Sequence, residues 1–232
     1  MLPPCKSVRS GLWLEPDIAT LTDRPELTHT LAAEPAESPV ALPLPHRQRM
    51  LVLGTVMLCI FTAMLSNQIV ATALPSIVSS FDGMERFGWV GSAYLLAQAT
   101  VMPIYGKIGD LVGRKAVLVF ALSVFLLGSA SCALAWSMES LIAARAFQGL
   151  GGGGIVVSAF GVTADIFQTR ERARYQSYNS LLLVASASIG PTAGGVLSAA
   201  LGWRSIFLVT LPLGLIALAG IVALLPSARS SG

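Results

Sequence analysis

The sequence predicts an all-α membrane protein, a bundle of about six transmembrane helices. Of its 232 residues, 54% are hydrophobic and only 12% are charged, whereas a soluble domain usually carries about 25% charged residues. The apolar residues form long runs between about residues 50 and 226, and the charges fall in short clusters between them. A bilayer core about 30 Å thick needs roughly 20 apolar residues of helix, and six runs reach that length. Strands of a membrane barrel would alternate apolar and polar residues, but these runs are apolar all round.

The six predicted spans follow one another through short connections, so neighbouring helices are expected to run antiparallel. They cover about residues 50–78, 88–105, 116–136, 141–164, 177–201 and 206–225.

The two ends of the chain differ from the spans. Residues 1–49 are rich in Pro, Glu, Thr and Ala and contain no apolar run, whereas a secretory signal needs about 7–15 apolar residues. We interpret them as a disordered cytoplasmic tail and residues 227–232 as a cytoplasmic end.

Basic residues in short loops predict the orientation, because they favour the cytoplasmic side. The connections on one side, together with the two ends, carry Arg47, Arg49, Lys107, Arg114, Lys115, Arg170, Arg172, Arg174 and Arg229. The other side carries only Arg86 and Arg204. The prediction is a multi-pass protein of the plasma or inner membrane with both termini in the cytoplasm.

Several function classes are disfavoured by the same distribution. The net charge of +3 does not indicate a nucleic-acid partner, because the basic residues sit at the ends of apolar runs and not on one soluble face. Cys59 and Cys132 fall inside apolar runs and are expected to be small buried side chains. No cluster of His, Cys or acidic residues within the spans has metal-binding or catalytic spacing, so no metal site, no cofactor and no enzyme are predicted.

The connection after the second span, residues 106–115, combines glycines with charges. Glycine allows a tight turn, and a solvated positive loop would account for the charges but not for the glycine spacing. The segment resembles the loop signature of the major facilitator superfamily, G-x-L-a-D-r-x-G-r-k, and departs from it at Leu111, where a basic residue is common. The matching positions are Gly106, Asp110, Gly113, Arg114 and Lys115.

The fourth span contains Arg145, the one charge inside any predicted span. Burying arginine at mid-bilayer costs about 2.5–3.5 kcal/mol on insertion scales, and snorkelling to the outer surface is the alternative. Arg145, Gln148, Gly149 and Gly152 share one helical face, which favours an inward-facing stripe. The stretch resembles the fourth-helix signature R-x-x-Q-G of the superfamily, and that resemblance ties the arginine to proton coupling or substrate handling.

The fifth span carries a stripe of small residues, Ser186, Gly190 and Gly194, beside a proline that removes a helical hydrogen bond, Pro191. Plain helix packing would explain the stripe. With Gly195, the segment resembles the antiporter signature G-x-x-x-G-P-x-x-G-G, with Ser186 in place of the first glycine. The resemblance implies an exporter.

The first span contains residues 67–75, similar to the element L-D-x-T-I-V-x-x-A-L-P of the fourteen-helix drug:proton antiporter branch, and residues 89–96 fit the same branch. The aspartate of that element falls on Ser66. No carboxylate remains within any predicted span, since Asp110, Glu139 and Asp165 lie at span ends. Either a missing half supplies the proton carrier, Arg145 works with a bound carrier, or this copy is degenerate.

The resemblance implies the N-terminal half of a major facilitator fold, built from two inverted three-helix repeats. Asn67 and Gln68 lie about 15 Å below the outer end of their helix, and Arg145 and Gln148 about 8–13 Å below theirs, at 1.5 Å per residue. We therefore expect these four side chains to face one central cavity. The resemblance also implies an ion pair between Arg114 and Asp165, with Asp110 facing the other half.

The implied function is secondary active transport by alternating access, with proton-coupled export of drugs or other small molecules. The alternatives are the same fold with a siderophore, sugar or metabolite as substrate, and a truncated membrane protein that does not transport. The expected partners are a small-molecule substrate, the lipid bilayer and a second half of six to eight helices from the same gene or another chain.

Overall fold

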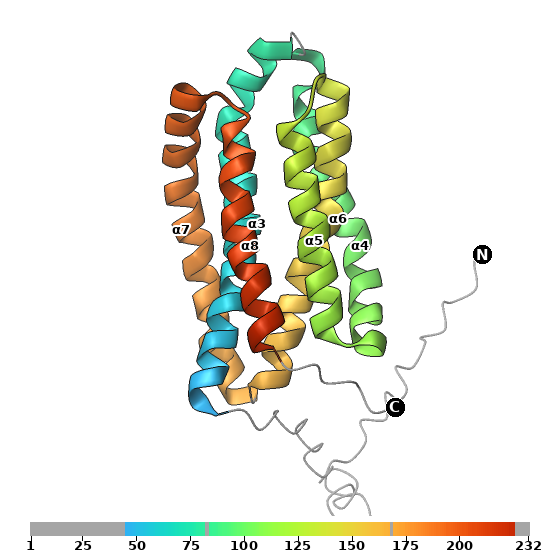
Figure 1. Ribbon diagram of the computed structural model, residues 1–232, viewed down its shortest axis with the longest axis vertical. Coiled ribbons are helices and arrows are strands. Elements are labelled where there is room, and N and C mark those ends of the chain that lie inside the picture. The colour runs from blue at the N-terminus through green and yellow to red at the C-terminus, as the bar shows by residue number, and fades with distance from the viewer. Residues whose placement is uncertain (1–44, 82–83, 168, 226–232) are drawn as a thin grey trace, which may run out of the picture. The chain divides into compact units, whose positions relative to one another are not determined.

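The computed structural model describes residues 45–81, 84–167 and 169–225, and of residues 46 and 169–176 it describes the backbone alone. This part of the chain forms six α-helices and one short 3-10 helix, and it contains no strand. In order they are α3 (His46–Phe81), η1 (Met84–Arg86), α4 (Phe87–Val112), α5 (Arg114–Ala133), α6 (Met138–Ile166), α7 (Thr169–Leu201) and α8 (Ser205–Leu224). Figure 1 shows the helices aligned along one common axis, with successive connections at alternate ends.

Several sequence expectations fall outside the described residues. They concern most of the tail (residues 1–44), the end segment 227–232 with Arg229, and the side chains of Arg170, Arg172 and Arg174. One boundary differs within the described part, because α3 begins at His46 and not near Met50.

Five of the six described helices are long and apolar enough to cross a membrane. The exception is α4, although its 26 residues would span a bilayer by length. Its interior carries Gln98 and Thr100, and its last turns carry Lys107 and Asp110. The six predicted spans therefore correspond to six helices that are long enough to cross a bilayer, five of which are also apolar enough.

The helices form two groups, visible side by side in Figure 1. Helix α6 packs mainly on α4 and α5, and α3 packs mainly on α7 and α8, while α3–α6 and α5–α8 contacts join the groups. When α3–α4–α5 and α6–α7–α8 are taken as two repeats, the first helix of each repeat packs on the second and third helices of the other. That exchange is the contact pattern of two repeats related by a pseudo-two-fold axis.

Glycines of α6 allow this close packing. A Cβ atom added at Gly153 would lie 2.6 Å from the Gln98 carbonyl oxygen of α4, and one at Gly151 would lie 2.6 Å from the Ala121 carbonyl oxygen of α5. Without hydrophobic driving force between helices in lipid, such close approach supplies much of the association energy through van der Waals contacts.

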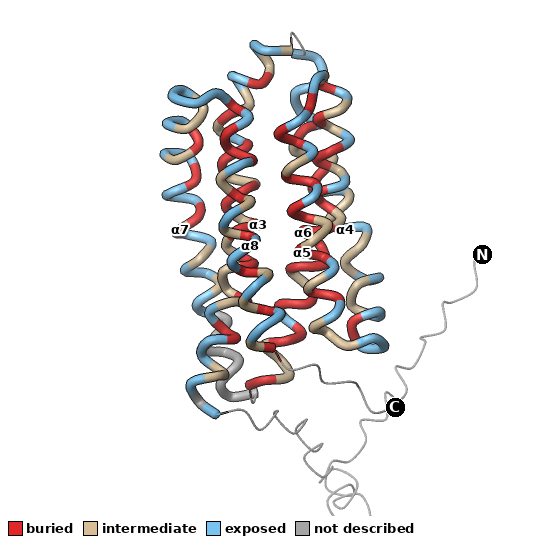
Figure 2. The backbone as a smooth tube through the Cα atoms, in the orientation of Figure 1, coloured by how far each residue is buried: buried red, intermediate tan, exposed pale blue. Residues whose placement is uncertain are grey.

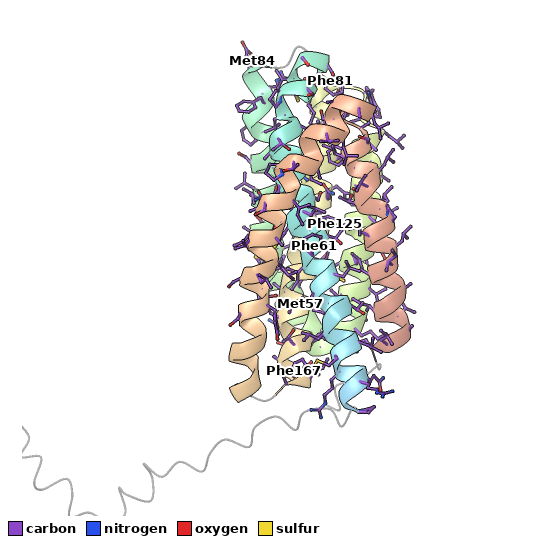
Figure 3. All side chains as sticks on the ribbon, turned by 90° about the vertical axis from the view of Figure 1, so that its left-hand side faces the viewer. Met57, Phe61, Phe81, Met84, Phe125 and Phe167 are labelled. Atoms are coloured by element: carbon purple, nitrogen blue, oxygen red, sulfur yellow. The ribbon has the colours of Figure 1, made fainter. Side chains whose placement is uncertain are left out.

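Two apolar clusters fill the interior along the bundle. One includes Phe125 and Ile155, and the other includes Ile69, Leu141 and Phe207. Figure 2 shows the buried residues along the facing sides of the helices, whereas most residues of α7 between 177 and 201 are exposed. Figure 3 marks the two ends of the bundle, with Phe81 and Met84 at one end and Phe167 at the other.

The turn between α4 and α5 rests on a single glycine of the loop signature. Gly113 has φ +102°, a conformation that favours glycine, whereas Gly106 and Gly109 lie inside α4. The second predicted span ended near residue 105 because apolarity marks the membrane and not the end of the helix. In the structure, α4 continues to Val112.

Polar bonds connect α5 and α8 at three heights. At one end, Lys115 Nζ donates to the Val222 carbonyl oxygen over 3.0 Å and also to that of Leu225. Between the two ends, and about one turn from the second, the hydroxyls of Ser129 and Thr210 lie 2.6 Å apart. At the other end, in the connections beside these helices, Arg204 Nη2 donates to the Ala135 carbonyl oxygen over 2.9 Å.

Candidate functional site

The side chain of Arg145 in α6 is completely buried and bonded to three helices. Its Nη1 donates to Gln148 Oε1 over 2.6 Å, and its Nη2 donates to Asn67 Oδ1 of α3 over 3.1 Å. Its Nε donates to the Val90 carbonyl oxygen of α4 over 3.4 Å. The guanidinium carbon also lies 4.3 Å from the ring centroid of Tyr94. The snorkelling alternative is thereby disfavoured, because the side chain points into the bundle.

All these partners of Arg145 are neutral. The ion pairs among the described residues join Arg86 to Glu139, and Arg114 to Asp110 and Asp165, none of which reaches Arg145. Hydrogen bonds to a charged group contribute about 1.5–3 kcal/mol each, and the ring face adds a cation–π attraction. These contacts hold the guanidinium in place without cancelling its charge, and an ionisable group inside a membrane bundle usually marks a functional site.

Gln148 extends the network to α3 and α5. Its Oε1 accepts from Arg145, and its Nε2 donates to Ser66 Oγ over 3.3 Å. The thiol of Cys132 in α5 lies 3.9 Å from the same Oε1. Ser66, the position where the resemblance leads one to expect an aspartate, is therefore one amide away from the guanidinium.

A cavity of about 180 Å³ lies beside this network. Its walls combine amide and hydroxyl groups with apolar side chains, and the lining residues are Ala63, Met64, Asn67, Gln68, Tyr94, Leu95, Gln98, Val156, Leu183 and Ser186. Arg145 and Gln148 do not line it, and Arg145 contacts two of the lining side chains, Asn67 and Tyr94. The structure thus places two of the four expected cavity residues at the cavity wall and the other two in the network that supports it.

Tyr94 and Gln98 are site residues that the sequence reasoning missed. They stand four residues apart on one face of α4, as two polar side chains in an apolar run, and that spacing could have indicated them. Tyr94 fits because α6 has glycine opposite it. A Cβ atom at Gly152 would collide with the Tyr94 hydroxyl, and one at Gly149 would collide with its carbonyl oxygen.

The small-residue stripe of α7 packs on α3. A Cβ atom at Gly190 would lie 2.6 Å from Gln68 Cβ, and one at Gly194 would lie 3.0 Å from the Ile69 carbonyl oxygen. Ser186 is fully buried and lines the cavity. The other two signature positions do not join this contact, since Pro191 is exposed and Gly195 faces open space.

At the end of the bundle that carries the loop signature, one arginine binds two carboxylates. Arg114 Nε lies 3.1 Å from Asp165 Oδ2 of α6, and Arg114 Nη2 lies 3.2 Å from Asp110 Oδ1 of α4. The side chain of Arg114 also covers Gly161, where a Cβ atom would collide with it. Asp110, which we expected to face another half, contacts Arg114 while its side chain remains 69% exposed.

The remaining positions of the loop signature have different surroundings. Gly106 lines a cavity of about 310 Å³ together with Asp110, Arg114 and Gly161. Gly113 makes the turn, and Lys115 binds the end of α8 instead of the carboxylates.

Comparisons with known proteins agree with this architecture. Residues 56–231 match the family model of the Major Facilitator Superfamily. An uncharacterised transporter of this type from Schizosaccharomyces pombe is 38% identical over 193 residues, which cover 83% of this chain and 33% of the relative. The multidrug transporter protein MdtP of Bacillus subtilis is 36% identical over 186 residues, which cover 80% of this chain and 34% of the relative.

A solved structure shares the fold. The crystal structure of the human organic anion transporter MFSD10 superposes with a TM-score of 0.65 at 19% identity, over 79% of this chain and 48% of that one. The predicted fold class, a helical half of this transporter fold, is confirmed. The chain spans about a third of the length of the curated relatives that it matches. From its sequence and its six-helix bundle, this multi-pass membrane protein belongs to the major facilitator superfamily.

Proposed function

We propose that the chain is the N-terminal half of a secondary active transporter that works by alternating access. The observation that carries the proposal is the uncompensated Arg145, which is held at the junction of both repeats and directly behind the wall of a partly polar cavity. Such a charge is costly in a membrane protein and is rarely retained without a task in transport. Membership of a transporter family supports a carrier and not an enzyme.

Export of drugs or other small molecules is the proposed direction and cargo. It is supported by the stripe on α7, which resembles the antiporter signature, and by the name of the Bacillus relative, a multidrug transporter. Because Gly190 and Gly194 pack closely on α3, helices α3 and α7 would move together as one unit.

Proton coupling is the proposed energy source, with the carboxylate supplied by a second half. No Asp or Glu lies near the middle of any described helix: Glu139 and Glu171 are in the first turns of α6 and α7, and Asp110 and Asp165 are in the last turns of α4 and α6. A titratable carrier within the membrane is nonetheless expected for coupling to protons. The partner half of six to eight helices would therefore supply both that carrier and the opposite wall of the cavity.

The proposed orientation places the loop-signature end in the cytoplasm of the cell membrane. The start of α3, the turn between α4 and α5, and the end of α8 lie at this end in Figure 1. It carries Lys107, Arg114 and Lys115, whereas Arg86 and Arg204 lie at the other end. The bias follows the rule that basic residues favour the cytoplasmic side.

Efflux measurements test the proposal. The complete reading frame that contains this chain would be expressed in a strain that lacks its main drug exporters, and dye efflux driven by a proton gradient would be recorded. Arg145→Gln should abolish efflux, whereas the matched variant Arg86→Gln, at an exposed arginine on the opposite end of the bundle, should leave it unchanged. Equal efflux from both variants at equal membrane levels, or no efflux from the unaltered protein, would contradict the proposal.

A further inference from the structure

The charge of the site suggests which substrates it selects. Arg145 contributes one positive charge, and every described contact that it makes is neutral: Gln148, Asn67, the Val90 carbonyl and the Tyr94 ring. The walls of the adjoining cavity carry no charged side chain among the described residues. Among the described residues, the charge that adjoins the cavity is thus the Arg145 guanidinium, which contacts the lining residues Asn67 and Tyr94. In surroundings of low dielectric constant, such a charge acts over longer distances than in water.

The cavity wall also offers a hydrogen-bond donor for an anionic group, the side-chain amide of Asn67. Asn67 Oδ1 accepts from Arg145, which fixes the amide orientation because the guanidinium has no acceptor. In the described part of the chain no other bond involves this amide, so its Nδ2 protons remain for a molecule in the cavity. The bond to Arg145 polarises the amide and strengthens it as a donor.

We propose that the cavity selects lipophilic organic anions, such as aromatic carboxylates or sulfonates. The inference rests on the proposed function, because it names the substrate class of the same site. Met64, Leu95, Val156 and Leu183 would contact the apolar body of the ligand, and Asn67 would donate to its acidic group, with Arg145 behind it. A lipophilic cation of the same shape would meet a like charge, and no carboxylate on the described wall of the cavity offsets that charge.

The charge bias can be measured without transport. In the 232-residue chain, the three native cysteines are replaced by alanine, and Leu95→Cys is introduced at a half-exposed cavity position. The chain is placed in nanodiscs of phosphatidylcholine, which contain no anionic lipid that could occupy the site. The modification rates of this cysteine by an anionic sulfonatoethyl and a cationic trimethylammonioethyl methanethiosulfonate are then compared.

Removing the charge of Arg145 should lower the ratio of anionic to cationic rates. Arg145→Gln is expected to lower it on the order of a hundredfold, since a unit charge about 10 Å away at an effective dielectric constant of about 20 changes each rate roughly tenfold, and in opposite directions for the two reagents. Ser66→Asp, which keeps the arginine and adds a carboxylate one amide away, should lower it as well, while Ser66→Asn should not. As a control, Met84→Cys at the far end of the bundle should show no change with Arg145→Gln.

Ligand protection completes the test. With Arg145 present, 2-naphthoate should slow the modification of Leu95→Cys more than 2-naphthamidine does, and Arg145→Gln should remove the difference. Unchanged rate ratios in both Arg145→Gln and Ser66→Asp, protection by neither ligand, or stronger protection by the cation would overturn the anion preference. Because neither readout requires efflux, a failure of this inference can be told apart from a failure of the proposed transport function.

Discussion

The Nη2 group of Arg145 donates a hydrogen bond to Asn67 Oδ1 over 3.1 Å, and this bond links the first helix of one repeat to the first helix of the other. Both residues lie away from the ends of their helices, so the bond joins α3 to α6 within the bundle, directly behind the cavity wall. Its removal should therefore affect the stability of the whole bundle and not of one helix alone.

Replacing Asn67 by alanine tests this bond. Asn67→Ala leaves a buried guanidinium donor unpaired, and the expected loss of stability is about 1–3 kcal/mol, measured as a lower unfolding temperature in detergent. Gln68→Ala is the matched control, since this neighbouring amide lines the same cavity without contacting Arg145, and it should stay within about 0.5 kcal/mol of the unaltered protein. Equal losses in the two variants would show that the bond to Arg145 adds no stability.

Charge reversal tests the pairing of Arg114 with Asp165. Each single reversal should impair efflux, and the double variant Arg114→Asp with Asp165→Arg should restore it in part. Restoration should improve when Asp110→Asn is added, because Asp110 also lies beside Arg114 and would repel a carboxylate placed there. Both carboxylates are substantially exposed, and such pairs contribute only about 0–1 kcal/mol, so efflux and not melting is the measurement. If the triple variant transports no better than the single reversals, the pairing has no role in transport.

Two adjacent glycines test whether α7 packs tightly on α3, because Gly194 contacts α3 and Gly195 faces open space. Gly194→Ala should lower the unfolding free energy by about 1–3 kcal/mol, because the new methyl group would collide with Thr72 and the Ile69 carbonyl of α3. Gly195→Ala meets nothing within 4 Å and should be neutral or slightly stabilising. Comparable melting of the two variants would show that α7 does not pack tightly on α3.

Lys115 is expected to stabilise the end of α8. It donates to two carbonyl oxygens in the last turn, where helices have unpaired acceptors and a negative dipole end. Lys115→Met should cost about 0.5–1.5 kcal/mol and should speed amide hydrogen exchange in that turn. Lys107→Met, at an exposed lysine of α4, should change neither quantity, and faster exchange in both variants would point to a general effect of charge.

Much of the fold could be predicted because the bilayer imposes a length on each apolar run. The continuation of α4 to Val112 could not, since the polar residues after Tyr105 leave the apolar region without leaving the helix.

The site was predictable in part for a similar reason. A lone arginine in an apolar span had to find partners, and Gln148 lies within one turn of it on the same face. Its partners on α4, the Val90 carbonyl and the Tyr94 ring, depend on how far α4 slides along α6. That register is set by Gly149 and Gly152, which accommodate the backbone and the ring of Tyr94. The residue pattern of one helix alone does not predict how it packs against another. The roles of these residues in transport stay predictions.

The bonds between α5 and α8 at three heights have a mechanical consequence. Twisting one repeat against the other would break the Lys115, Ser129–Thr210 and Arg204 contacts together. The Ser129–Thr210 bond is buried, so its loss would not be made good by water. The bundle should therefore move as a rigid body, so that a displacement at one membrane face is transmitted to the other. In the proposed transporter, a change of access would then arise from rotation of the whole bundle against the proposed second half, with little bending inside the bundle.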